Sequence, residues 1–278
     1  MRPRDFIPLA LLGGIAVFIV VQGREMGRNR QARRPVEPQP VAAESTTTIT
    51  PQGQPASPPA SRPRRHVIDV VPAAELRASE EPAPIRDDAV VRQQIKENET
   101  GTYLRAILEQ QHQMLMRWPQ RQREALRVYI ARVANISDWD PTYPLAAEKA
   151  FEEWKQAGFP LRFDMVTDRV NADILILWVD RFSANDGQQI GLTNKSRDQS
   201  GWLVSAEITI ATHASDGEKL SPELIAGVAR HEVGHALGLG HSTNTADVMY
   251  PQATTPVISD SDRSTLHLLY MLPPGIVK

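Results

Sequence analysis

Residues 231–241 read His-Glu-Val-Gly-His-Ala-Leu-Gly-Leu-Gly-His. The first part of this stretch ends a segment, residues 222–237, whose apolar spacing predicts a helix. On a helix, His231 and His235 lie on the same face with Cβ atoms about 5–6 Å apart. Both imidazoles can therefore reach one zinc ion. Glu232 lies about 100° further round the helix, close to such a metal without having to ligate it.

The end of the same stretch supplies a third candidate ligand. Gly238 can adopt the left-handed conformation that ends a helix and turns the chain, so His241 can return toward the metal. Three neutral imidazoles leave a fourth position open for water, which is typical of a catalytic zinc site and not of a structural one. Histidine makes up only 7 of 278 residues, and a chance match to the whole pattern has a probability of roughly two in a hundred thousand.

The composition of the chain excludes several classes of protein. It contains no cysteine, so disulfides, thiolate metal sites and cysteine nucleophiles are excluded, and a metal must be held by His, Asp or Glu. The net charge of −2 is the sum of a basic N-terminal part and an acidic remainder. Residues 1–65 hold ten Arg against four acids, or +6, which leaves 21 basic against 29 acidic residues, or −8, in residues 66–278. We therefore expect no nucleic-acid partner for the acidic part.

The N-terminal part has the composition of a targeting segment followed by a spacer. Residues 1–23 contain a nearly pure apolar run, FIPLALLGGIAVFIVV, after two Arg. Its length lies between a long signal peptide and a short membrane anchor. The excess of Arg after the run conflicts with the positive-inside rule for an exported C-terminal part. Residues 24–88 are rich in Pro, Ser, Thr, Gln and Arg, which predicts an extended, disordered spacer.

Residues 89–117 are predicted to be a helical segment. The apolar side chains from Tyr103 to Leu115 recur at steps of three and four, which indicates an amphipathic helix that ends before Trp118-Pro119. We expect its apolar stripe to pack on the domain that follows. An inhibitory pro-segment is the alternative.

Residues 118–278 are predicted to form the catalytic domain. Strands are expected at 125–133, 160–166, 173–180 (fully buried, from its unbroken Ile, Leu and Trp) and 201–212. Helices are expected at 144–157, 222–237 and 259–270, the last with Ser259 and Asp262 as a capping-box pair. The first of these helices is expected to turn five side chains inward: Leu145, Ala147, Ala150, Phe151 and Trp154. The alternation predicts an α/β (α+β) fold with a mixed twisted sheet and covering helices.

With these residues in place, the sequence resembles the matrixin branch of the metzincin zinc endopeptidases, especially its short bacterial members. The resemblance rests on HEVGHALGLGHS, on Met249-Tyr250-Pro251 and on the order of flanking segments between Trp118 and Tyr270. It implies a zincin-like catalytic domain with one catalytic zinc on His231, His235 and His241. It further implies Glu232 as the catalytic base and Met249 as the Met-turn floor beneath the metal, with Gly238 supporting the site.

Three departures from the family pattern limit what the resemblance implies. The absence of cysteine rules out the family's pro-segment cysteine switch. Between residues 181 and 213 only His213 could bind a second, structural zinc, so none is predicted. Ala253 stands where the family often has a Tyr in the wall of the specificity pocket. For calcium the loop acids Asp186, Asp198 and Asp216 show no ligand spacing, and we expect them to be solvated.

The predicted function is peptide-bond hydrolysis by a zinc-bound water with Glu232 as general base. The expected partner is a protein or peptide substrate, and a monomer is expected. The protein is expected to be anchored in a membrane and to face the extracytoplasmic side, or to be secreted if residues 1–23 are cleaved. Two alternatives stay open: a membrane-tethered binding module without proteolysis, and an enzyme restricted to small peptides or to its own spacer.

Overall fold

The computed structural model describes residues 85–120, 125–183, 189–252 and 257–278. The predicted targeting segment at 1–23 and nearly all of the predicted spacer at 24–88 lie outside these residues. Within the described ranges, no helix combines the length and the apolar character that a membrane span requires.

Thirteen elements follow one another along the described chain: α1 (Asp88–Glu97), α2 (Leu104–Gln110), β1 (Met114–Leu115), β2 (Leu126–Ile130), α3 (Tyr143–Gln156), β3 (Phe163–Val166), the 3-10 helix η1 (Arg169–Asn171), β4 (Ile174–Val179), β5 (Gly191–Arg197), β6 (Leu203–Ala211), α4 (Pro222–Ala236), α5 (Asp260–Met271) and β7 (Gly275–Ile276).

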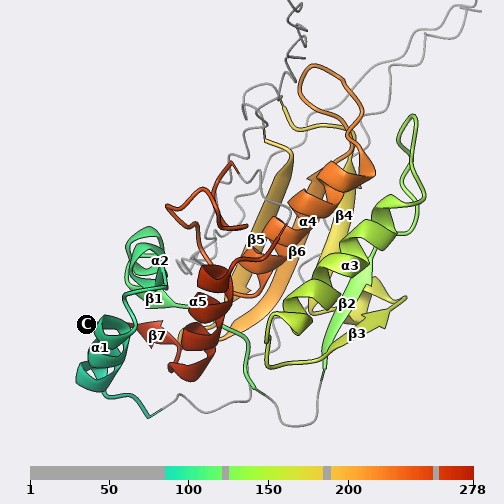
Figure 1. Ribbon diagram of the computed structural model, residues 1–278. Coiled ribbons are helices and arrows are strands. Elements are labelled where there is room, and N and C mark those ends of the chain that lie inside the picture. Colours follow the sequence, from blue (N-terminus) through green and yellow to red (C-terminus); the bar gives the residue numbers. More distant parts are fainter. Residues whose placement is uncertain (1–84, 121–124, 184–188, 253–256) are drawn as a thin grey trace, which may run out of the picture. The chain divides into compact units, whose positions relative to one another are not determined.

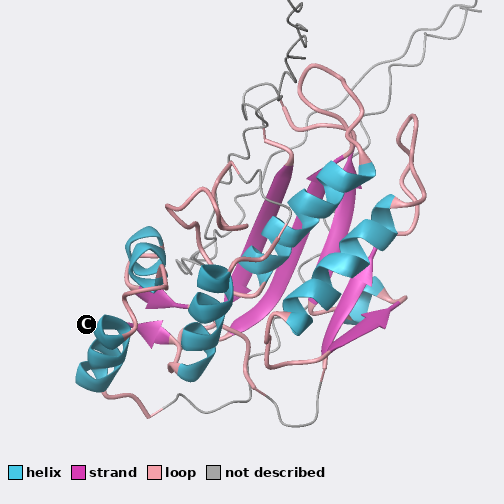
Figure 2. Ribbon diagram, viewed as in Figure 1, coloured by secondary structure: helices cyan, strands magenta, loops and turns pink. Residues whose placement is uncertain are grey.

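A mixed sheet of five strands in the order β3-β2-β4-β6-β5 forms the centre of the fold. The strands β3, β2, β4 and β6 run parallel to their neighbours, and β5 pairs antiparallel with β6 at one edge. The helices α3 and α4 lie side by side over one face of this sheet (Figures 1 and 2). The predicted α/β class with a mixed sheet and covering helices is confirmed.

The burial of the sheet residues alternates along the central strand β4. In β4, Ile174, Ile176 and Trp178 are buried, whereas the residues between them are only partly buried. The prediction of a fully buried strand was wrong, because only alternate side chains reach the closely packed face. The inward assignment of Leu145 in α3 was also wrong, since its exposed fraction is 58%.

The segment before the sheet differs from the single long helix that was predicted. The helix α2 ends at Gln110, and His112 and Gln113 adopt positive φ angles of 50° and 63°. The chain then enters β1, which pairs antiparallel with β7 near the C-terminus. A separate helix, α1, precedes α2 and begins at the N-cap Asp87, whose carboxylate accepts from Ala89 N and Val90 N.

The capping box predicted at the start of the last helix is present. The Ser259 hydroxyl accepts from Asp262 N at 3.0 Å, and the Asp262 carboxylate accepts from Ser259 N at 2.9 Å. This reciprocal pair fixes where α5 begins. Asp262 itself is fully buried, which places its carboxylate inside the domain.

Candidate active site

Three imidazoles converge at the C-terminal end of α4. His231 and His235 stand one turn apart on the helix, and the chain turns at Gly238, with a φ of +108°, to bring His241 back. The Nε2 atom of His235 lies 3.1 Å from His231 Nε2 and 3.2 Å from His241 Nε2. Within the described ranges, one ligand atom from each of the three residues lies within 4.8 Å of the others.

The second ring nitrogen of two of these histidines faces a backbone carbonyl. His231 Nδ1 lies 2.7 Å from Val248 O, and His235 Nδ1 lies 3.0 Å from Leu239 O. A carbonyl oxygen only accepts hydrogen bonds, so each Nδ1 carries the proton and each Nε2 presents a lone pair. Lone pairs at 3.1 Å repel one another unless a cation lies between them. This donor set therefore fits a metal ion, in the tautomer that metal-binding histidines use.

The environment keeps the three rings neutral. Burial lowers the pKa of His231 to about 3 and that of His241 to about 4, and it holds the pKa of His235 well below its ordinary value. Metal binding requires neutral imidazole. The two separations from His235 Nε2, 3.1 and 3.2 Å, also suit zinc, because nitrogen ligands at about 2.0–2.1 Å in a tetrahedral arrangement lie about 3.4 Å apart.

Glu232 is buried next to His231 and is held by β5. The Thr193 hydroxyl donates to Glu232 Oε2 at 2.6 Å, and Thr193 is itself only 3% exposed. Glu232 Oε1 is buried and has no hydrogen-bond partner within the described part of the chain. Burial raises the pKa of this carboxyl to about 8, although the Thr193 hydrogen bond acts in the opposite direction.

Gly191 makes room for this carboxylate. A Cβ atom at position 191 would lie 2.3 Å from Glu232 Oε1, so a larger residue would displace it. Neither Gly191 nor Thr193 was identified from the sequence, because the strand GLTNKSR is mostly polar and lacks a clear alternation. The sequence offered one weak signal for this contact, namely the glycine at 191 followed by a threonine at 193, before the strand predicted at 201–212.

Met249, the residue predicted to form the Met turn, packs against α4. A Cβ atom at Gly234, between the first two histidines, would lie 2.3 Å from Met249 Sδ, so this glycine lets the methionine approach. The Asp262 carboxylate accepts from Val248 N at 2.8 Å and from Met249 N at 3.4 Å. The structure thus places Met249 against the helix that carries two of the three imidazoles.

The remaining sequence candidates have other surroundings. His213 is buried, with Nδ1 2.9 Å from Asp180 Oδ1. The carboxylate of Asp198 accepts from Ser200 N and Trp202 N, and that of Asp216 accepts from Glu218 N, so both acids stabilise turns. Two further candidates, Asp186 and Ala253, lie outside the described residues.

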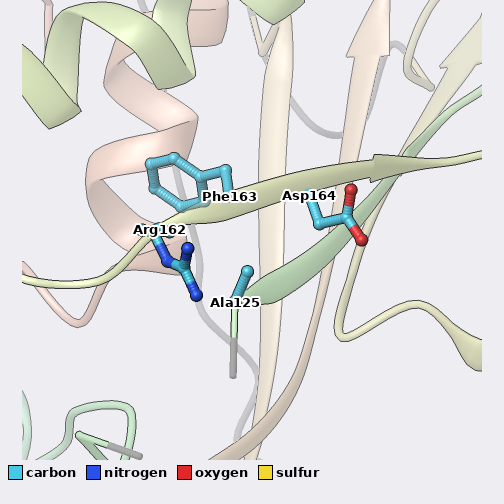
Figure 3. Close-up of a pocket in the computed structure, with 4 residues that line it drawn as sticks. All are labelled: Ala125, Arg162, Phe163 and Asp164. Atoms are coloured by element: carbon cyan, nitrogen blue, oxygen red, sulfur yellow. The ribbon is translucent and has the colours of Figure 1, made fainter. Parts of the chain in front are cut away.

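A pocket of about 340 Å³ opens elsewhere, lined by Ala125, Arg162, Phe163 and Asp164 (Figure 3). It lies at β2 and β3, at the opposite edge of the sheet from β5. Since Thr193 on β5 contacts Glu232, this pocket is not part of the histidine site.

Comparison with known proteins agrees with this geometry. The profile of the family described as Matrixin matches residues 132–271. Metalloendoproteinase 1-MMP of Arabidopsis thaliana is 32% identical over 109 residues, which cover 37% of this chain and 30% of that protein. Stromelysin-1 of Equus caballus is 33% identical over 139 residues, or 46% of this chain and 28% of that protein. The chain thus matches less than a third of either relative. The family match takes in half of the chain, including the three histidines, and the chain belongs to the matrixin family.

Proposed function

We propose that the chain is a zinc-dependent endopeptidase that hydrolyses protein or peptide substrates with Glu232 as general base. The observation that carries this proposal is the convergence of three Nε2 atoms beside a buried glutamate in a matrixin chain. Both relatives match over only part of their length, and one of them, from Arabidopsis thaliana, is named a metalloendoproteinase.

His231, His235 and His241 would hold the metal through Nε2. When bound, zinc supplies a Lewis acid that polarises the scissile carbonyl and lowers the pKa of water to about 7. The carbonyls of Val248 and Leu239 hold the first two rings in the orientation that aims Nε2 at the site.

Glu232 would move the proton. Thr193 occupies Oε2, so Oε1, which has no partner among the described residues, is the atom we assign to accept the proton of the attacking water. The same carboxyl then delivers the proton to the leaving amine. A carboxyl whose pKa is raised by burial to about 8 lies near neutrality, where a group can both take and give a proton.

The substrate would bind in an extended conformation along β5. This strand is an edge of the described sheet, and it supplies Gly191 and Thr193 to the glutamate. Backbone hydrogen bonds to an added strand give affinity with modest sequence preference. We therefore propose endopeptidase action on unfolded or flexible segments.

Cleavage of casein and of a quenched fluorescent peptide tests the proposal. We expect the full chain to cut both, to lose activity with a chelator and to recover it with zinc. A binding module that keeps the metal but does not hydrolyse peptides would bind zinc and cut neither. An enzyme restricted to its own spacer would cut neither, yet mass spectrometry would show fragments ending between residues 24 and 88.

We also propose a monomer on the extracytoplasmic side, anchored through residues 1–23 or secreted after their removal. The apolar run after two Arg supports this location. N-terminal sequencing of the protein from membrane and soluble fractions tests it. An N-terminus at Met1 in cytosolic material would contradict it.

A further inference from the structure

The segment before the sheet, residues 103–118, contacts the end of α4 and the loop that follows. The last carbonyls of a helix have no partner within it. Trp118 Nε1 donates to one of them, Ala236 O, at 2.8 Å. At the helix end, a Cβ atom at Gly238 would lie 2.3 Å from Met116 O, so the two backbones approach as closely as a glycine allows.

Gln110, the last residue of α2, pairs with the backbone of the third histidine. Its Nε2 donates to His241 O at 2.9 Å, and its Oε1 accepts from His241 N at 2.8 Å. One side-chain amide therefore holds the peptide groups on both sides of the His241 Cα atom. A Cβ atom at Gly240 would lie 2.7 Å from Gln110 Oε1, so only a glycine there leaves room for this pairing.

The helix that carries Gln110 is fixed to the domain. Leu104 and Ile107 are fully buried, and Tyr103 OH donates to Asp262 Oδ1 at 2.9 Å. That carboxylate also accepts from Val248 N and thereby holds the Met turn. This segment thus contacts the backbone of His241 directly and reaches the backbone of Val248 through the Asp262 carboxylate.

The three histidines differ in how they are held. The helix fixes the backbone of His231 and His235. His241 comes after the helix has ended, and its side chain is less buried than theirs. Its position depends on contacts made from outside its own loop, and the two hydrogen bonds from Gln110 are such contacts.

We propose that Gln110 is a positioning residue for the third metal ligand, which makes α2 a permanent part of the metal centre and not a removable inhibitory segment. The proposal rests on the proposed function, because it takes His241 to be a zinc ligand. The family match covers residues 132–271, and α2 lies before these residues.

Two variants of the full chain test this role. Gln110→Met keeps the length of the side chain and removes both hydrogen bonds, whereas Gln110→Glu keeps an acceptor for His241 N and loses the donor. Gln93→Met is the matched control, since Gln93 is an exposed glutamine of α1 whose amide donates to Glu97 in the same helix.

Three measurements are made on each protein: the rate of zinc release to a chromophoric chelator, the visible spectrum of the cobalt-loaded form, and the melting temperature after metal removal. Losing two exposed neutral hydrogen bonds predicts about tenfold faster zinc release from Gln110→Met. We expect an intermediate rate for Gln110→Glu, an altered cobalt spectrum for Gln110→Met, and the parental rate and spectrum for Gln93→Met. The metal-free melting temperatures should stay close to the parental value.

Parental release rates and cobalt spectra in both Gln110 variants would overturn the proposal. A metal-free melting temperature that falls while release stays parental would overturn it as well, because Gln110 would then only stabilise the fold. Failure of the parental chain to bind zinc or cobalt would instead overturn the proposed function.

Discussion

Thr193→Val is the substitution that isolates the hydrogen bond to the proposed general base. Valine has nearly the shape of threonine and cannot donate, so Glu232 Oε2 loses the contact that the structure shows at 2.6 Å. Its other oxygen already has no partner among the described residues. A hydrogen bond to a charged group contributes about 1.5–3 kcal/mol, which equals about one to two pKa units.

The sign of the effect follows from the pKa of Glu232. Burial raises this pKa to about 8, and the Thr193 hydrogen bond lowers it. Without that bond the pKa rises further, and the carboxylate form needed to accept a proton becomes scarcer at neutral pH. A bound cation lowers the pKa in both proteins, so their difference is the quantity to compare. We expect the acidic limb of the kcat/KM profile to move up by about one to two pH units, with a loss of about tenfold to a hundredfold at pH values below the parental pKa.

The assay is cleavage of a quenched fluorescent peptide across pH 5 to 9, with zinc content measured on the same samples. Thr193→Ser keeps the hydroxyl and is the matched control, for which we expect a profile close to the parental one. A Thr193→Val protein with full zinc and the parental pH profile would show that this hydrogen bond does not tune the base.

Three further predictions concern the metal and the packing around it. Lowering the pH from 7 to 5 should destabilise the metal-free protein. The experiment uses Glu232→Gln, because the raised pKa of Glu232 would by itself make the folded protein more stable at the lower pH. At pH values between the lowered pKa of the folded state and about 6.5, His231 and His241 take up a proton only in the unfolded state. This lowers the free energy of unfolding by about 2 kcal/mol per group at pH 5. Urea unfolding measures this, and equal or greater stability at pH 5 would contradict it. Gly234→Ala should lower the free energy of unfolding by about 1–3 kcal/mol, because its Cβ atom would meet the Met-turn sulfur at 2.3 Å. Gly227→Ala in the same helix meets nothing within 4 Å and should be stabilising, by about 0.5–1 kcal/mol; denaturant unfolding of both variants separates the two effects. Chelation should lower the melting temperature and zinc should restore it, with a stabilisation that grows with the logarithm of free zinc; a melting temperature independent of zinc would argue against a metal site.

The histidine cluster could be predicted because its geometry is local. His231 and His235 are fixed by helical spacing alone, and Gly238 marks the turn that returns His241, with the positive φ that this turn requires. The capping box at Ser259 was predictable for the same reason. Each of these features depends on residues within one helix or one turn.

The features that were missed depend on contacts between distant parts of the chain. The strand β5 carries few apolar residues, and it is held by pairing with β6 and by the contact between Thr193 and Glu232. The predicted helix through Leu115 was wrong because residues 114–115 pair with residues 275–276, more than 150 positions away. The apolar spacing of that segment reports its burial and does not distinguish a helix that continues from one that ends and becomes a strand.

Zinc content and peptide cleavage, measured together on Glu232→Gln, test most sharply whether Glu232 is the general base of a zinc endopeptidase. We predict about one zinc per chain, held by the three imidazoles, and no cleavage of a peptide that the parental protein cuts. Cleavage at the parental rate would contradict the role of Glu232, and loss of the zinc along with the activity would show that this residue acts through the metal site itself.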